Sequence, residues 1–246
     1  MRLILASLMR KYVRMKLGRQ FLVGILLRLR GLTVCMLYFI RHNGILWEVR
    51  FVILVQGVFN GQRIPSEINK TLIVLIPKVE HPDSLRLYRP ISLYPVIYKA
   101  ITKIVANRLK GILPELIEPM QTSFVPRRHI TENIIIAQEI IHTMHRKSGK
   151  IGQMLIKVDL EKAYDRLSWD FIFKTLCEAG IPSDLTHITM DCITSASMQI
   201  LWNGECTEEF IPSQGIRQGD HISPYIFVLC IERLSHGIHR AVNTGT

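Results

Sequence analysis

The chain has 246 residues, of which 48% are hydrophobic and 21% charged, so it is too apolar to be mostly disordered and long enough for one large or two small domains. The net charge of +11 is concentrated in residues 1–47, which hold nine Lys or Arg and no acid, whereas the remainder holds 22 basic and 20 acidic side chains. The basic composition is therefore poor support for nucleic-acid binding by the main part of the chain.

The basic N-terminal part, which we assign to residues 1–50, contains two apolar runs, Phe21–Leu27 and Gly31–Ile40. Both are shorter than the roughly 18 residues that a membrane span requires, so no stable span is expected. Three interpretations stay open: a segment without a selected role, an organellar transit peptide, or a helix on a membrane surface. Five scattered cysteines without CxxC spacing favour reduced thiols and hence a nuclear or cytoplasmic location, with organellar targeting by residues 1–47 as the alternative.

Ordered elements are predicted from about residue 50 onward. Thr71–Ile76 is a β-branched, apolar run that ends at a proline, which predicts a buried strand. Val96–Lys110 has helical periodicity, and Thr131–Met144 repeats apolar residues at three- and four-residue spacing, which predicts an amphipathic helix. Ile151–Val158 returns to the pattern of a strand.

The C-terminal part continues this mixture of helix and strand patterns. Ser168 is suited to cap a helix that runs to Gly180. Met198–Trp202 and Cys206–Ile211, joined by Asn-Gly, predict a β-hairpin on a type I′ turn. The loop Pro212–Asp220 leads into a last helix with a proline in its first turn. Because this is no regular βαβ series and contains no internal repeat, we predict an α+β, palm-like fold.

One candidate site lies in KVDLEKAYDRLSWDFI, residues 157–172. Asp159 ends a predicted strand, and carboxylate oxygens in such a place suit Mg²⁺, although an Asp that caps the following turn is the alternative. Tyr164 is placed to lie beneath a nucleotide sugar, where its ring would collide with a ribose 2′-OH; ordinary core packing is the alternative. Asp165 is assigned a structural role.

A second candidate site is the loop SQGIRQGDHISPYIF, residues 213–227. Gly215 and Gly219 permit close backbone approach to a ligand, and the amide of Gln218 both donates and accepts hydrogen bonds. The following helix directs its N-terminal amides at the same loop. The alternative is a plain connection between a hairpin and a helix.

Further polar groups are less specific. A loop that contains prolines carries three cations, Lys78, Arg86 and Arg89. They are suited to bind a triphosphate, and the alternative is a basic loop that is simply exposed to solvent. Two histidine pairs have i, i+3 spacing but no third ligand at a motif spacing, so the sequence predicts no zinc site; they are His142/His145 and His236/His239.

Four stretches together resemble the reverse transcriptase domain of LINE-type non-LTR retrotransposons, especially the plant lineages. In the family's order and with similar separations, they are TLIVLIPKVEHPDSLRLYRPISLYPVIYKAITKIVANRLK, QTSFVPRRHITENIIIAQEIIH, KVDLEKAYDRLSWDFI and GIRQGDHISPYIFVLCIERLS. The resemblance is good from about Gly57 to the end of the sequence. It implies an RNA-directed DNA polymerase that uses Mg²⁺, an RNA template, a DNA primer and deoxynucleoside triphosphates.

The resemblance also implies roles for individual residues. Asp159 matches the first metal-binding and catalytic aspartate of the palm, with the backbone of Leu160 as a further metal ligand. Tyr164 matches the aromatic residue that excludes ribonucleotides. Gln218 and Gly219 match the loop that contacts the incoming nucleotide and template. The remaining nucleotide-binding candidates are cations in the fingers, Lys78 and Arg89.

Several positions depart from the family pattern. Arg127 stands where the family usually has the glycine of FVPGR, which costs stability if the backbone there needs a positive φ. Glu132 replaces the usual Asp of TDN, and His221 the usual Pro of QGDP. The family's second pair of metal ligands lies in a Phe/Tyr-Ala-Asp-Asp hairpin, and the 246 residues contain no Asp-Asp pair.

We therefore expect residues 51–246 to form a partial right-hand polymerase, with fingers and an incomplete palm, truncated at its C-terminal side with the thumb missing. Such a fragment is expected to be inactive alone and marginally folded, with the strand at residues 151–159 exposing an unpaired edge and an apolar face. Two alternatives stay open: a non-catalytic module that binds RNA or primer–template, and a translated relic without function.

Overall fold

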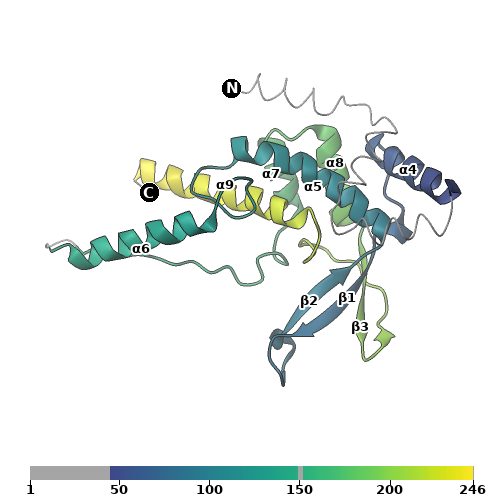
Figure 1. Ribbon diagram of the computed structural model, residues 1–246, viewed down its shortest axis with the longest axis horizontal. Helices are drawn as coiled ribbons and strands as arrows, with labels where there is room; N and C mark the ends of the chain where they lie inside the picture. Colours follow the sequence, from purple (N-terminus) through teal and green to yellow (C-terminus); the bar gives the residue numbers. More distant parts are fainter. Residues whose placement is uncertain (1–44, 149–151, 246) are drawn as a thin grey trace.

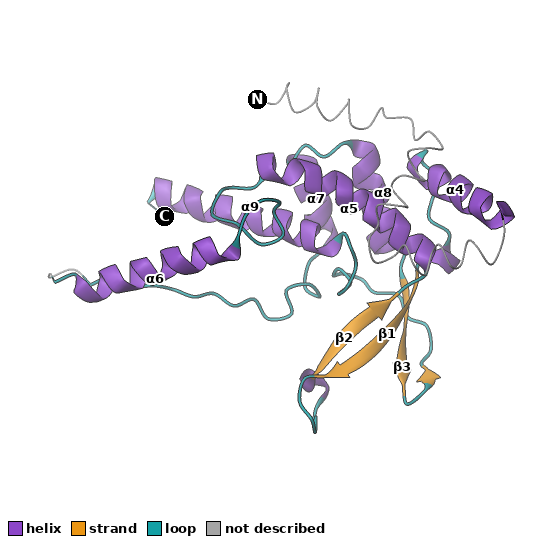
Figure 2. Cartoon of the chain, in the orientation of Figure 1, coloured by secondary structure: helices purple, strands orange, loops and turns teal. Residues whose placement is uncertain are grey.

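The computed structural model describes residues 45–148 and 152–245. The helices form one layer, from which a small sheet projects (Figures 1 and 2). The helices are α4 (Ile45–Phe59), α5 (Val96–Leu116), α6 (Ile130–Arg146), α7 (Trp169–Glu178), α8 (Ser183–Thr194) and α9 (Ser223–Thr244). The strands are β1 (Lys70–Pro77), β2 (Tyr88–Leu93), β3 (Ser197–Trp202) and β4 (Glu205–Cys206). The mixed α and β content agrees with the predicted class.

The sheet has the order β2-β1-β3-β4, with β1 antiparallel to β2 and parallel to β3. The strand predicted at residues 71–76 is confirmed as β1 and is central, since Val74 faces Ile91 on one side and Leu201 on the other. It is not the buried strand that was predicted, because only Thr71 is buried and Ile76 is 48% exposed. The predicted hairpin is also confirmed. Its two turn residues, Asn203 and Gly204, have φ values of 50° and 88°, as a type I′ turn requires. Its second arm is shorter than expected, because β4 holds only two residues.

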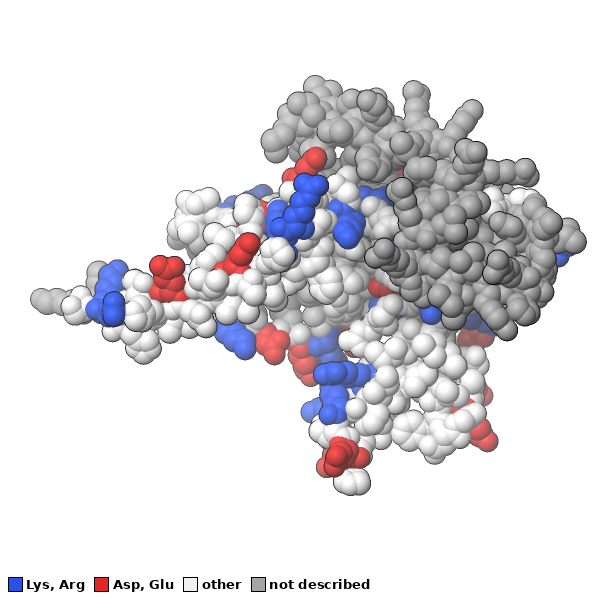
Figure 3. All heavy atoms as spheres, viewed as in Figure 1, with Lys and Arg blue, Asp and Glu red and all other residues white. Residues whose placement is uncertain are grey.

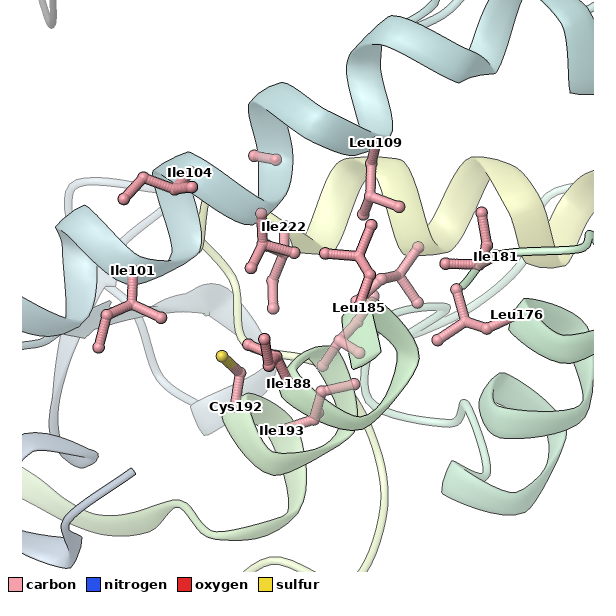
Figure 4. Packing of buried hydrophobic residues seen from close by; sticks show 14 of the residues in the cluster. Ile101, Ile104, Leu109, Leu176, Ile181, Leu185, Ile188, Cys192, Ile193 and Ile222 are labelled. Carbon is pink, nitrogen blue, oxygen red and sulfur yellow. The ribbon is translucent and has the colours of Figure 1, made fainter. Parts of the chain in front are cut away.

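Helix α5 is the centre of the hydrophobic core. Its periodic apolar residues Ile101, Val105 and Leu109 are fully buried, which confirms the helix predicted from residue 96. They pack with residues of α7, α8 and α9, among them Leu176 and Ile226. Figure 4 shows part of this cluster, with Leu176 and Leu185 near α5. This packing supplies most of the stabilisation of the helices, because burial of a large aliphatic side chain contributes about 1.5–3 kcal/mol. The described part of the chain has no helix that is both long and apolar enough to cross a membrane.

Helix α7 confirms the helix predicted after Ser168. That residue occupies the N-cap position, but its side chain makes no capping hydrogen bond. At the other end Gly180 has a φ of 72°, the left-handed conformation that ends helices. Three elements were not predicted, namely α4, β2 and α8.

The prediction of a strand at Ile151–Val158 is wrong. Residue 151 lies outside the described residues, and residues 152–160 form neither strand nor helix. The apolar side chains of this segment are exposed, with Met154 at 82% and Val158 at 72%. An isolated segment cannot form a ladder, because the backbone N–H and C=O groups of a strand need a partner strand, and no described residue pairs with it.

Helix α6 is confirmed as an amphipathic helix, but its apolar side is exposed. None of its residues is buried, and Ile134, Ile140 and Ile141 are 42–50% exposed. A hollow between α6 and the exposed segment is lined by Ile136, Ile140, Met154 and others. Figure 1 shows α6 standing apart from the other helices. The apolar pattern of both segments therefore lacks the burial that usually explains such patterns.

Arg127 has a φ of 65°, so the position does need the backbone conformation that favours glycine. Its side chain is exposed. A non-glycine residue pays about 1–2 kcal/mol in this conformation. The expectation that the arginine costs stability thus has a structural basis.

We predict that Arg127→Gly raises the free energy of unfolding by about 1 kcal/mol. Urea denaturation of the full chain, followed by circular dichroism, measures the change. Arg127→Ala is the matched control, since it removes the side chain but keeps the Cβ, and it should give no comparable gain. Equal effects of the two substitutions would contradict the backbone explanation.

Candidate functional site

The loop before α9 is attached to the segment before α7 by backbone contacts. The N–H of Gly215 donates to the carbonyl of Leu167 at 2.7 Å, and the N–H of Ile216 donates to that of Tyr164 at 2.9 Å. The indole Nε1 of Trp169 donates to the carbonyl of Gly215 at 2.9 Å. Gly215 has a φ of 87°, and a Cβ there would lie 2.9 Å from the carbonyl oxygen of Asp165. Only glycine fits this close approach without a shift.

Arg217, the next charged residue of the loop, is buried in the protein. Its Nη1 donates to the side chains of Asn69 and Thr71, at 2.8 and 2.7 Å. Its Nη2 donates to the carbonyl of Cys192 at 2.7 Å and to the hydroxyl of Tyr98. These partners belong to the start of β1, to α8 and to α5. One guanidinium thus joins the loop to both layers of the fold.

Asp220 supplies the opposite charge at the end of the same turn. Its Oδ2 lies 3.6 Å from Nη2 of Arg217, and the two side chains are each 3% exposed. The hydroxyl of Tyr98 donates to the same oxygen at 2.7 Å. Burial raises the pKa of Tyr98 well above its usual value, and the charge of Asp220 raises it further. The hydroxyl therefore stays protonated and remains a donor to the carboxylate.

The turn between these two buried charges presents Gln218 and Gly219 to solvent. Both residues are exposed, and Gly219 has a φ of 93°. The N–H of Ser92, in β2, donates to the carbonyl of Gln218 at 3.3 Å. Beside Gly219 lies the buried hydroxyl of Tyr94, which has no hydrogen-bond partner among the described residues. Burial, and after it the charge of Asp220, raises the pKa of Tyr94.

Three predicted site residues come together around one hollow of about 530 Å³ at the start of α9. Its walls include Tyr164, Gln218 and Gly219. The ring of Tyr164 stacks on Phe227 of α9, with centroids 5.0 Å apart and an interplanar angle of 18°. Tyr164 is half-buried, and burial raises the pKa of its hydroxyl. Tyr164 thus packs against α9 and also lines the hollow, and its role beneath a nucleotide sugar stays a prediction.

The other predicted site residues do not line this hollow. Asp159 and Leu160 are exposed on the unpaired segment 152–160. Lys78 and Arg89 are exposed on the β1–β2 hairpin, and Nζ of Lys78 donates to the carbonyl of Arg86 at 2.9 Å. In Figure 3 a group of blue spheres lies beside this part of the sheet. The loop half of the predicted site is therefore assembled, and the metal half is not.

The described residues do not fit a two-metal centre at Asp159. Such a centre needs several oxygen ligands that converge on the ions. Asp159 belongs to no group of three metal-ligating side chains in the described part of the chain. The chain offers one carboxylate and, from Leu160, one backbone carbonyl at this place.

Some residues of this region had no predicted role. The sequence pattern assigns no role to Arg217 and Asp220, nor to Lys103, Phe124 and Tyr225, which line the hollow. The only sign in the sequence of the hydrogen-bond network around Arg217 is that an acidic residue, Asp220, follows it at a spacing of three residues. The partners on β1, α5 and α8 lie far away along the chain, so periodicity cannot reveal them. His221, noted as a departure, also lines the hollow, and burial followed by the charge of Lys103 lowers its pKa.

We predict that Arg217→Met destabilises the chain by about 3–5 kcal/mol, because it leaves the carboxylate of Asp220 buried without its partner. The double variant Arg217→Met/Asp220→Asn should recover part of this loss, since it removes the uncompensated charge. Urea denaturation of both variants, with Asp220→Asn alone to complete the cycle, measures the coupling. Additive effects would contradict a direct interaction between the two charges.

Comparison with known proteins agrees with this arrangement. Residues 76–245 match the model of the family described as reverse transcriptase (RNA-dependent DNA polymerase). The chain is 28% identical over 192 residues to the retrovirus-related Pol polyprotein from the type-2 retrotransposable element R2DM of Drosophila melanogaster, covering 78% of this chain and 17% of that protein. It is 28% identical over 174 residues to the transposon TX1 149 kDa protein of Xenopus laevis, covering 71% of this chain and 13% of that protein.

A shorter stretch of 34 residues is 56% identical to an uncharacterized mitochondrial protein of Arabidopsis thaliana, covering 14% of this chain and 28% of that protein. The chain thus spans only a small part of the length of the curated relatives it matches. The family match covers the loop, the hollow and most of the described elements. The chain belongs to the reverse transcriptase family, and its domain is similar to the polymerases of non-LTR retrotransposons.

Proposed function

We propose that residues 51–246 are the fingers and the first part of the palm of an RNA-directed DNA polymerase from a LINE-type retrotransposon of a plant lineage. Residues 1–50 are then a separate basic segment, to which the proposal assigns no role. The Arabidopsis match and the four ordered sequence stretches support the plant assignment. In this proposal the substrates are an RNA template, a DNA primer and deoxynucleoside triphosphates.

The observation that carries the proposal is the hollow at the start of α9. Gln218 presents an amide suited to a base or sugar edge, and Gly219 leaves the backbone open to close approach. The ring of Tyr164 lines the same hollow, where it would meet the sugar of a bound nucleotide. The N-terminus of α9 favours negative charge, as a phosphate carries. The buried hydroxyl of Tyr94 is a further donor beside the turn.

We further propose that these 246 residues do not synthesise DNA by themselves. In the full enzyme, Asp159 and the carbonyl of Leu160 would contribute to the Mg²⁺ ions that activate the primer hydroxyl and stabilise the leaving pyrophosphate. Here no second acidic pair accompanies them, because the 246 residues contain no Asp-Asp sequence. Electrostatic stabilisation of this kind is worth several kcal/mol per ligand group, so its loss removes most of the catalysis.

Primer extension on an RNA template with Mg²⁺ tests this proposal. The purified 246-residue chain should give no more product than its Asp159→Ala variant. A commercial reverse transcriptase on the same primer–template serves as the positive control. DNA product that depends on Asp159 would show that the chain is active and would overturn the proposal.

A second candidate function is binding without catalysis. The candidate binding loop and the candidate metal ligand differ in how they are supported, which favours this function. The loop is held by buried contacts of Arg217, whereas Asp159 lies on an exposed segment that pairs with no strand among the described residues. The cations Lys78 and Arg89 are exposed on the β1–β2 hairpin, from which they would contact a phosphate backbone. A module of this kind would keep affinity for primer–template while being catalytically silent.

We predict that the chain binds an RNA–DNA primer–template with an affinity that falls as salt rises, because phosphate contacts release counterions. Fluorescence anisotropy at several salt concentrations measures both the affinity and the slope. Lys78→Ala/Arg89→Ala should lower the slope by about one to two. The matched control is Lys174→Ala on α7, which pairs with Asp170 away from the loop and should change neither quantity. Binding that is insensitive to salt would exclude this second function.

A further inference from the structure

A cluster of two glutamates and two histidines lies outside the loop and its hollow. Three of its members follow one face of α9 at intervals of one turn, namely Glu232, His236 and His239. The fourth is Glu118, which follows the end of α5 and is 114 residues away from Glu232 along the chain. This is the one group of at least three metal-ligating side chains in residues 45–148 and 152–245 whose ligand atoms all lie within 4.8 Å of one another, its three members being Glu118, Glu232 and His236.

The distances within the cluster suit a metal ion better than hydrogen bonds. Nε2 of His236 lies 3.5 Å from Oε1 of Glu118 and 3.4 Å from Oε1 of Glu232. These separations exceed the usual range of about 2.7–3.2 Å for an N–H···O hydrogen bond. Ligands bound tetrahedrally to Zn²⁺ at about 2.0–2.1 Å lie about 3.3–3.4 Å from one another. The two distances from His236 thus match the edges of a zinc coordination shell, and all three ligand atoms lie within 4.8 Å of one another.

The two carboxylates are held firmly in place. Oε1 of Glu232 accepts the backbone N–H of Glu118 at 2.8 Å, and the side chain of Glu232 is only 6% exposed. Arg128 fixes the backbone after α5, since its guanidinium donates to the carbonyl of Ile117 at 2.8 Å and to that of Glu118 at 2.5 Å. Nδ1 of His239 lies 3.3 Å from Oε2, the other oxygen of Glu118. The site thus has both a set of ligands and a supporting shell, as zinc sites do.

The charge of the cluster also favours a divalent cation. No Lys or Arg in the described part of the chain forms an ion pair with Glu118 or Glu232. The nearby guanidinium of Arg128 is directed at backbone carbonyls, and that of Arg233 pairs with Glu178 at 2.7 Å. Two carboxylates with neutral imidazoles carry two negative charges, which one divalent ion neutralises.

We propose that Glu118, Glu232 and His236 bind a divalent transition-metal ion of the zinc class, with His239 orienting Glu118. The ion would join α9 to the segment that follows α5. The role is structural, since the site lies apart from the hollow around Gln218. It does not depend on polymerase activity.

Isothermal titration of the metal-free full chain with ZnCl₂ tests the proposal, with thermal unfolding as a second readout. We expect saturable 1:1 binding and a rise in Tm, and His236→Gln should weaken binding more than tenfold. His236 is 57% exposed, so this substitution leaves the core intact. The matched control is His142→Gln/His145→Gln, an exposed pair with the same spacing on α6, which should bind like the unaltered chain.

Co²⁺ in place of Zn²⁺ distinguishes this cluster from the thiols, because Cys177 and Cys206 are exposed. Ligation by carboxylate and imidazole should give visible d–d bands without the strong sulfur-to-cobalt absorption in the near ultraviolet. An unaltered affinity in His236→Gln, absence of saturable binding, or a sulfur-to-cobalt band would each overturn the proposal. In those cases the cluster is a set of ion pairs between histidines and glutamates.

Discussion

The buried guanidinium of Arg217 is the contact on which the loop before α9 depends. It bonds to side chains at the start of β1, to the hydroxyl of Tyr98 in α5 and to a carbonyl of α8, so a single group ties the loop to the sheet and the helices. Burial of this charge is tolerated because every contact is hydrogen-bonded and Asp220 balances it. Gln218 and Gly219, which stand between the two charges, are presented to solvent on a rigid support.

The segment around Asp159 shows the opposite situation. Its backbone has no partner strand among the described residues, and its apolar side chains are exposed together with the apolar side of α6. The loop before α9 is therefore held in place by contacts within the chain, whereas the segment around Asp159 is not. The physical difference is that the loop finds its hydrogen-bond partners within the helices and β1, whereas an isolated strand cannot satisfy its own backbone.

Helix α9 links the two sites that we propose. Its first turn borders the hollow, where Phe227 stacks on Tyr164. Farther along, Glu232 and His236 meet Glu118 after α5. The position of the helix is thus determined at its start by the loop and in its second half by polar contacts to α5. Apolar packing of residues such as Ile226 lies between them.

The sequence by itself determined the elements whose stabilisation is local or periodic. The β1 run, the periodicity of α5 and α6 and the Asn203–Gly204 turn all appear in the structure. The positive φ at Arg127, which the sequence raised only as a condition, was decided by the structure. Ordered motifs also identified the family and singled out Tyr164, Gln218 and Gly219, which the structure places around one hollow. Only the tertiary structure decided what depends on distant partners. The strand pattern of residues 152–158 lacked a neighbour to pair with, and the partners of Arg217 and of His236 come from remote elements, because side-chain contacts across the fold leave no periodic trace in the sequence.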